Sequence, residues 1–197
     1  IQTNSNPLNC LKYRDYMSNT KTNTAGLSTN LLRRLALMQH LGEDFFIIQG
    51  DDVEGIEPIA FKGTEEDARE GFLADIEGTE EPDIDANFRI YCQNNLAEVE
   101  ELDIDDCYDV DYYVLTDEEA DEKWEESLDS YIEECITPEI ERLSEGAGNL
   151  GYYVTFNEEM WKRDARMDGR GHSLSSYDGN ENEETVGDTT FYIYRIN

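Results

Sequence analysis

The chain has 197 residues, of which 47 are Asp or Glu and 15 are Lys or Arg, so its formal net charge is −32. This sign of charge excludes broad binding to nucleic acid or to an anionic membrane surface, because both rely on Lys and Arg. No apolar run approaches the ~18 residues of a membrane span. An aromatic content of 11% predicts a folded chain rather than an acidic tail.

The amino-terminal segment, residues 1–27, is predicted to be disordered because it is rich in Asn, Thr and Ser and lacks apolar periodicity. The first methionine is Met17, and we interpret residues 1–16 as a non-native addition. This segment contains no apolar core of a signal peptide. The four cysteines of the chain form no CxxC pair, which favours reduced thiols in a cytoplasm.

The first predicted element after this segment is a helix. It can be capped by Ser28 and ended by Gly42, and its leucine-rich stripe has helical spacing. Arg33 lies off that stripe. Two strands are then predicted at 45–49 and 56–61, joined by turn residues.

The next stretch is predicted to hold a helix, a strand and a short helical segment. Thr64 and Asp67 form a start signal for the helix. Its predicted core positions are Ala68, Phe72, Leu73 and Ile76. Residues 87–92 are predicted as a strand. A spacing of three predicts the helical stripe formed by Leu96, Val99 and Leu102.

The strongest periodic pattern lies between residues 107 and 136. Apolar and aromatic residues alternate with Asp109 and Asp111 over 107–115, which predicts a strand. Thr116 and Glu119 form a capping box that opens the longest predicted helix, 117–136. Its apolar stripe is formed by Ala120, Trp124, Leu128, Tyr131 and Cys135, and its other faces are acidic.

The carboxyl-terminal part is predicted to begin with a short helix at Thr137-Pro138. A strand is predicted at 150–156 and a helical turn at 157–161. Two further strands, 170–177 and 191–196, are predicted to pair in antiparallel fashion. Together these elements predict an α+β fold: a single acidic domain over 28–197, with antiparallel strands and one long acidic amphipathic helix.

The sequence contains only incomplete versions of known metal-binding motifs. The acidic stretch that begins at Asp103 has Tyr108 where an EF-hand loop needs Gly and Val114 where it needs Glu. The two histidines, His40 and His172, have no Cys within four residues, as a zinc site would require. We therefore expect no cofactor or metal.

The residues around His172 suggest an alternative function. His172, Ser173 and Asp178 supply the residue types of a nucleophile, a base and an orienting group, although no nucleophile elbow is present. A small enzyme or metal-binding protein with a site near His172 and its neighbouring carboxylates is the alternative to a protein that acts by binding.

The charge imbalance is confined to the middle of the chain. Residues 43–142 hold 36 acids and 5 bases, whereas 1–42 have a net charge of +4 and 143–197 of −5. The middle segment also has the strongest apolar periodicity, so its charge belongs to folded structure. A net charge of roughly 2–8 suffices for solubility, and the excess needs another explanation.

The spacing of the acids suggests that explanation. Strand residues i and i+2 and helix residues i and i+4 place carboxylates every ~5–7 Å, which approaches the phosphate density of DNA. The predicted partner-binding residues are Asp103, Asp105, Asp106, Asp109, Asp111, Asp117, Glu118, Glu119, Asp121, Glu122, Glu125, Glu126, Asp129 and Glu133. The predicted partner is a basic nucleic-acid-binding protein that the chain occupies in place of DNA. An unspecific acidic surface, tolerated in a saline cytosol, remains the other explanation.

Three stretches, 112–123, 169–179 and 191–195, are similar to segments of small uncharacterised acidic proteins of tailed bacteriophages and prophages. They cover under half of the chain. The resemblance implies a non-catalytic accessory protein in the cytoplasm of a bacterial host cell, and it carries over no catalytic residue. It favours a DNA mimic of the anti-restriction or anti-CRISPR type, which contacts a host protein and neither nucleic acid nor membrane directly.

Overall fold

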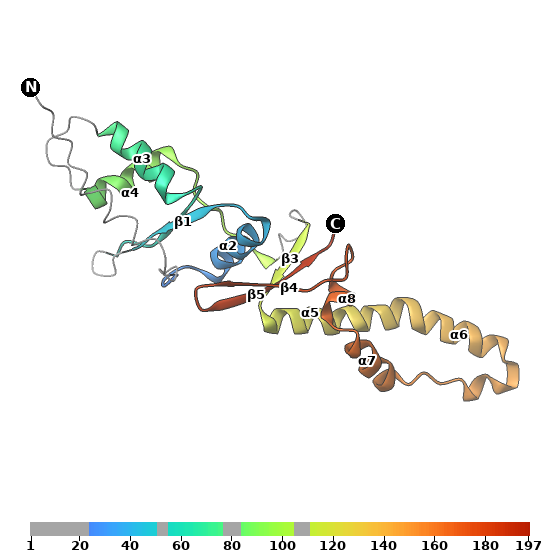
Figure 1. Ribbon diagram of the computed structural model, residues 1–197. Coiled ribbons are helices and arrows are strands. Elements are labelled where there is room, and N and C mark those ends of the chain that lie inside the picture. The colour runs from blue at the N-terminus through green and yellow to red at the C-terminus, as the bar shows by residue number, and fades with distance from the viewer. Residues whose placement is uncertain (1–23, 51–54, 77–83, 105–110) are drawn as a thin grey trace, which may run out of the picture. The chain divides into compact units, whose positions relative to one another are not determined.

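The computed structural model describes residues 24–50, 55–76, 84–104 and 111–197. They form two compact units, which we describe separately (Figure 1). The first unit includes residues 44–99, and the second includes 29–43, 100–185 and 189–197. Of the segment predicted to be disordered, residues 1–27, the first 23 lie outside the described part, including residues 1–16. Residues 24–27 form a turn in which the amide of Leu27 donates to Thr24 O (3.2 Å). Each unit combines helices with one small sheet, so the predicted α+β class is confirmed.

The first unit packs two helices against a two-stranded sheet. Strands β1 (Phe45–Ile48) and β2 (Ile59–Lys62) pair in antiparallel fashion, with Phe46 opposite Phe61. The helices are α3 (Glu65–Asp75) and α4 (Ile84–Asn95). As predicted, Thr64 caps α3 by accepting a hydrogen bond from the amide of Asp67. The core contains Phe46, Phe61, Ala68, Phe72, Phe88 and Cys92.

The predicted strand 87–92 is wrong, because these residues lie in helix α4. Phe88 and Cys92 are buried, whereas Ile90, which a strand would place on the same face, is 54% exposed. The burial therefore follows a helical spacing of four rather than an alternation of two. Leu73, a predicted core residue, is 58% exposed on α3.

The predicted helical stripe over 96–102 is also wrong. Lys62 donates its amide hydrogen to Ala97 O (3.0 Å), and Val99 donates to Ala60 O (2.9 Å). Glu98 forms an antiparallel bridge with Phe61. Residues 97–99 are thus extended along β2, and the amide of Leu102 donates to Asn30 O (3.1 Å). These are distant contacts that sequence spacing does not reveal.

The second unit has a three-stranded sheet in the order β3-β5-β4 within its described part. The strands are β3 (Tyr112–Leu115), β4 (Asn182–Val186) and β5 (Thr189–Arg195). Helix α2 (Thr29–Leu41) contacts β3 and β5 and ends before Gly42 at φ 72°, close to the predicted bounds. One core cluster contains Leu115, Ala120, Leu174 and Tyr194.

A helical segment with three parts follows β3. Helix α5 (Asp117–Tyr131) continues into a π-helical turn (Ile132–Ile136) and then into α6 (Thr137–Gly146). The predicted capping box at Thr116 and Glu119 is present. The α-helical part ends five residues earlier than predicted. Of the expected apolar stripe, Ala120 and Leu128 are buried, whereas Tyr131 and Cys135 are exposed.

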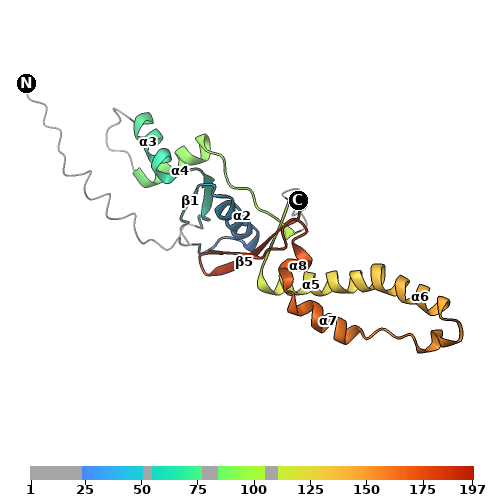
Figure 2. The ribbon, with the colours of Figure 1, turned by 45° about the vertical axis from the view of Figure 1, so that its right-hand side comes forward.

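The chain then returns along α5. A 3-10 helix (Gly148–Tyr153) occupies the predicted strand 150–156, and the predicted turn at 157–161 is the start of the ten-residue helix α7 (Glu158–Met167). Both views show α7 beside α5 (Figure 2). Local backbone hydrogen bonds take the place of a strand partner here, from Leu150 to Ala147 O (3.1 Å) and from Val154 to Gly151 O (3.0 Å).

The predicted strand 170–177 is wrong, and β5 pairs instead with β3 and β4. Helix α8 (Arg170–Leu174) occupies this position. It follows Gly169, whose φ of 84° few other residues adopt. Gly171 is buried against the backbone of Gly179, where a Cβ atom would lie 2.6 Å from the carbonyl oxygen. These backbone constraints are met by a short helix rather than by the predicted strand.

The predicted strand over 107–115 is described only from residue 111. Strand β3 starts at Tyr112, and Asp111 has a positive φ of 58° that ends the extended conformation. Within the described residues, no helix is both long and apolar enough to cross a membrane.

Candidate partner-binding surface

The acids of helix α5 fall into three groups with different surroundings. Glu119 faces the interior of the second unit. A second group, which we call the paired stripe, is formed by Asp117, Asp121, Glu125 and Asp129. A third group, which we call the outer stripe, is formed by Glu118, Glu122 and Glu126. The last two groups each have a spacing of four residues, which places their members on one face of a helix.

Glu119 forms an internal ion pair with Arg33 of α2. Arg33 is 2% exposed, and its two terminal nitrogens lie 2.8 Å from the two carboxylate oxygens of Glu119. Arg33 also donates to the carbonyl oxygen of Val114 and lies over the ring of Phe191. The hydrogen bond from Arg33 lowers the pKa of Glu119, against the effect of burial. This partly buried acid is therefore engaged within the second unit.

Sequence reasoning placed Arg33 off the apolar stripe and missed this contact. Burial in α2 extends around Arg33 to Leu32, Leu35, Ala36 and Leu37, so the helix is covered on more than one face. The signal available in the sequence was the small number of polar residues between 31 and 38, which is typical of a helix covered on several sides. Its partner 86 positions away could not be read from spacing.

The paired stripe binds bases of α7 and α8. Arg166 forms two hydrogen bonds of 2.8 Å to Glu125. Lys162 contacts Asp129, and Arg170 lies 2.8 Å from Asp117 and 3.0 Å from Asp121. The three bases are spaced by four residues, like the acids. Two antiparallel helical segments therefore match four acids to three bases in register.

Arg170 is the most enclosed of these bases, with a side chain that is 12% exposed. Besides the paired stripe it contacts Glu181 at 2.9 Å and lies 4.4 Å from the ring centre of Tyr192. The hydroxyl of Tyr194 donates to the same carboxylate at 2.7 Å. Burial, together with this hydrogen bond, raises the pKa of Tyr194. Arg170 thus joins α5 to the sheet.

The outer stripe has different surroundings. Glu118, Glu122 and Glu126 are exposed, and among the described contacts no hydrogen bond or ion pair engages their side chains. Glu133, in the π-helical turn, is likewise exposed. Neighbouring members of the stripe lie ~6 Å apart along the helix. Among the described residues, these four acids are predicted site residues that are exposed and have no described side-chain hydrogen bond or ion pair.

The other predicted site residues are dispersed. Asp103 is exposed, and its carboxylate accepts a hydrogen bond from the amide of Ile104. Asp111 accepts one from the side chain of Asn197 at 3.0 Å. Asp105, Asp106 and Asp109 lie outside the described residues.

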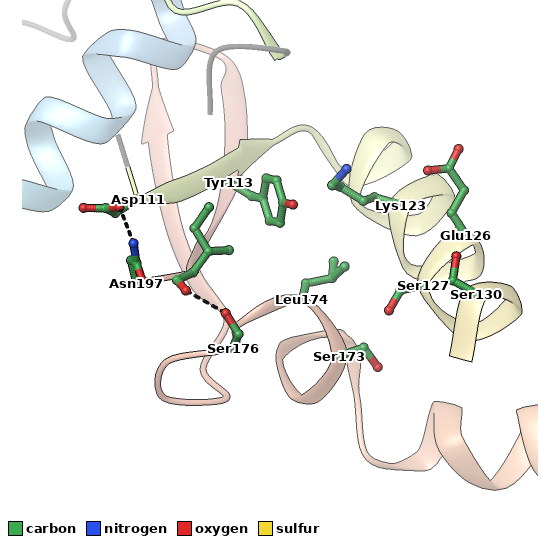
Figure 3. A pocket seen from close by; sticks show the side chains of 11 residues that line it. Asp111, Tyr113, Lys123, Glu126, Ser127, Ser130, Ser173, Leu174, Ser176 and Asn197 are labelled. Atoms are coloured by element: carbon green, nitrogen blue, oxygen red, sulfur yellow. Dashed lines mark hydrogen bonds between the residues drawn. The ribbon is translucent and has the colours of Figure 1, made fainter. Parts of the chain in front are cut away.

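A polar cavity of about 520 Å³ lies beside the outer stripe (Figure 3). Lys123 and Glu126 of α5 and Ser173 of α8 are among the residues that line it. The ammonium group of Lys123 lies 4.6 Å from the ring centre of Tyr113. These hydroxyl and charged groups suit polar recognition, but the described contacts show no hydrogen-bonded nucleophile and base.

A second cavity, of about 650 Å³, contains His172. It lies between α5, the π-helical turn, α7 and α8, and shares Ser127, Ser130 and Ser173 with the first cavity. Among the described residues, no three His, Cys, Asp or Glu side chains are grouped so that they could hold a metal ion. No hydrogen bond of the described part joins His172 to Ser173 or to a carboxylate. The geometry therefore gives no support to catalysis at His172.

The 3-10 segment after α6 displays apolar side chains. Tyr152 is 93% exposed, Tyr153 is 80% exposed, and Leu150 is also exposed. The segment is held to α6, because the hydroxyl of Ser144 donates to Gly151 O at 3.0 Å. An ordered, exposed apolar patch is typical of a protein-binding surface.

Comparison with protein-family models, with curated proteins and with solved structures finds no match to this chain.

Proposed function

We propose that the chain is a phage or prophage accessory protein that acts by binding rather than by catalysis. Its partner is a basic nucleic-acid-binding protein of a bacterial defence system, which it occupies in place of DNA in the host cytoplasm. The outer stripe is the centre of the contact surface. This proposal narrows the partner-binding acids from the predicted set between Asp103 and Glu133 to Glu118, Glu122 and Glu126 of α5 and Glu133 of the π-helical turn.

The observation that carries the proposal is the exposure of the outer stripe beside a fully engaged paired stripe. Two carboxylates ~6 Å apart repel each other by ~0.7 kcal/mol in water, and by more near a protein surface. The described bases of α2, α7 and α8 contact Glu119 and the paired stripe. Lys123 of α5 lies over the ring of Tyr113, so no described ion pair relieves the repulsion within the outer stripe. A partner with Lys and Arg at matching spacing would remove it, and repulsion would become attraction.

The paired stripe makes a contact of this kind within the chain. Lys162, Arg166 and Arg170 engage acids at a spacing of four residues. The outer stripe repeats this acid spacing on an exposed face of the same helix. A basic helix of a DNA-binding protein, which places its Lys and Arg along a phosphate backbone, could engage the outer stripe in the same register.

The test begins with capture of binding proteins from a bacterial lysate at low salt, followed by elution with duplex DNA. A protein eluted by DNA is then purified, and its affinity for the chain is measured with and without DNA. We expect mutually exclusive binding of the chain and DNA, with an affinity that falls steeply as salt rises. A captured protein that binds DNA and the chain together would contradict mimicry.

Two charge-reversed variants identify the surface. The triple variant Glu118→Lys, Glu122→Lys and Glu126→Lys should lose the partner, with at least a 100-fold loss of affinity. The control Glu43→Lys, Glu70→Lys and Asp75→Lys changes the net charge equally at exposed positions outside α5, and should lose much less. Equal losses in both variants would show that only net charge matters, as expected for an unspecific acidic surface.

A further inference from the structure

Several arginines of this chain are held in the same way, between a carboxylate and the face of an aromatic ring. In each case the guanidinium carbon lies 4.4 to 5.7 Å from a ring centre. The three sites are Arg33 with Glu119 and Phe191, Arg69 with Glu65 and Phe88, and Arg170 with Glu181 and Tyr192. A planar guanidinium suits this site, because it can stack on a ring while it donates to a carboxylate.

The cavity between α5, the π-helical turn, α7 and α8 contains the same pair of groups. Tyr131 and Trp161 stack with ring centres 5.6 Å apart and an angle of 3° between their planes. The carboxylates of Glu134 and Asp168 line the same cavity, and neither is engaged by a described ion pair. None of the described residues that line it is a lysine or an arginine; His172 is the one basic residue.

The cavity is also large and polar enough for a side chain from another molecule. Its volume is about 650 Å³. Ser127, Ser130 and Ser173 add hydroxyl groups to its wall, and the indole nitrogen of Trp124 donates to Ser173 Oγ at 3.1 Å. Tyr131 is exposed, so its ring can be reached from solvent.

From this arrangement we infer that the cavity binds an arginine side chain of a basic peptide segment, with the guanidinium stacked on the Tyr131–Trp161 pair and hydrogen-bonded to Glu134 and Asp168. The inference rests on the proposed function, in which the partner is basic, and it names the residue type and the place where that residue binds. Charge excludes a second copy of this chain as the main occupant, since each copy carries a net charge of −32. A lysine fits less well, because an ammonium group cannot stack as a plane or donate in a bidentate way.

The test uses two eight-residue peptides, one alternating Gly and Arg and the other alternating Gly and Lys, titrated into the full chain. Both tryptophans of the chain lie at the cavity, Trp161 in its wall and Trp124 bonded to Ser173, so tryptophan fluorescence reports occupancy. Titration calorimetry gives the affinity independently. We expect the arginine peptide to bind at least fivefold more tightly and to change the fluorescence. Equal affinities for the two peptides, or no binding of either, would overturn the inference.

Two double variants separate the cavity from general attraction. Glu134→Gln with Asp168→Asn should weaken binding of the arginine peptide at least tenfold. Glu118→Gln with Glu122→Gln removes the same charge from the outer stripe and should change it less than twofold. Equal losses would refute the site, and circular dichroism verifies that both variants fold. The peptide titration needs no host protein. The arginine peptide could therefore bind as expected even if the host partner does not exchange the chain for DNA. Conversely, the partner could exchange the chain for DNA while the arginine peptide does not bind, so the two proposals can fail separately.

Discussion

The paired stripe and the outer stripe are both built from carboxylate side chains, at the same spacing, on the same fifteen-residue helix. One stripe is matched in register by Lys162, Arg166 and Arg170, and the other faces solvent. The difference arises because α7 and α8 cover only one side of α5. The comparison teaches that an acid count, or even an acid spacing, does not separate carboxylates that build the fold from carboxylates that can bind a partner.

The largest expected effect comes from the acid that faces inward. Glu119→Gln keeps the size of the side chain but leaves the buried Arg33 without its counter-charge. Breaking a buried ion pair costs about 3–5 kcal/mol, so we expect a loss of stability of this size in urea unfolding. The neighbouring Glu118→Gln changes the same residue type on the outer stripe and should stay within about 0.5 kcal/mol. Similar losses in both variants would remove the distinction between inward and outward acids.

The next effect concerns the base that joins the paired stripe to the sheet. Arg170→Met leaves three carboxylates close together without their shared cation. We expect a loss of about 2–3 kcal/mol in the free energy of unfolding. Arg163→Met is the matched control, because Arg163 is exposed and pairs with the adjacent Asp164. A control as unstable as Arg170→Met would contradict a specific role for the stripe.

A dependence on pH follows from the lowered pKa of Glu119. Its carboxylate is stabilised by the fold, so this contribution is present above the ordinary pKa of 4.5 and is lost as pH falls through the lower value of the folded state. The difference in stability between the wild type and Glu119→Gln should therefore shrink on acidification below about pH 4.5, by up to ~1.4 kcal/mol per pH unit. A difference that is constant between pH 6 and pH 3 would show that the charge of Glu119 contributes nothing.

The smallest effect has the opposite sign. The triple variant Glu118→Gln, Glu122→Gln and Glu126→Gln removes repulsion without removing a described contact. We expect a gain in stability below about 1 kcal/mol at low salt, and almost none in 0.5 M salt, where the repulsion is screened. The matching variant of the paired stripe, Asp121→Asn with Glu125→Gln and Asp129→Asn, should instead have a lower unfolding midpoint. A loss of stability in the outer-stripe variant would mean that these acids support the fold.

Local signals in the sequence were sufficient where structure depends on neighbouring residues. The cap of α3 at Thr64 and the capping box at Thr116 and Glu119 were predicted and are present, because each joins residues three positions apart. Helix α2 and strand β1 were also predicted close to their observed bounds, since their apolar spacing and turn residues are local.

Local signals were misleading where backbone constraints or distant contacts decide. In 87–92 an alternation of apolar residues suggested a strand, yet burial selects Phe88 and Cys92 on one face of a helix. At 170–177 the predicted strand is replaced by α8, in which Gly171 packs against the backbone of Gly179. In both cases long-range packing outweighs a short pattern.

By itself, the sequence determined the excess of acid, its confinement to residues 43–142 and the helical register that sorts the acids of α5 into stripes. Only the tertiary structure decided which stripe is engaged. Arg33 lies 86 positions from Glu119 and Arg166 lies 41 from Glu125, so no local pattern joins them. A carboxylate acquires its role from the charge packed against it, and the fold brings that charge from distant parts of the chain.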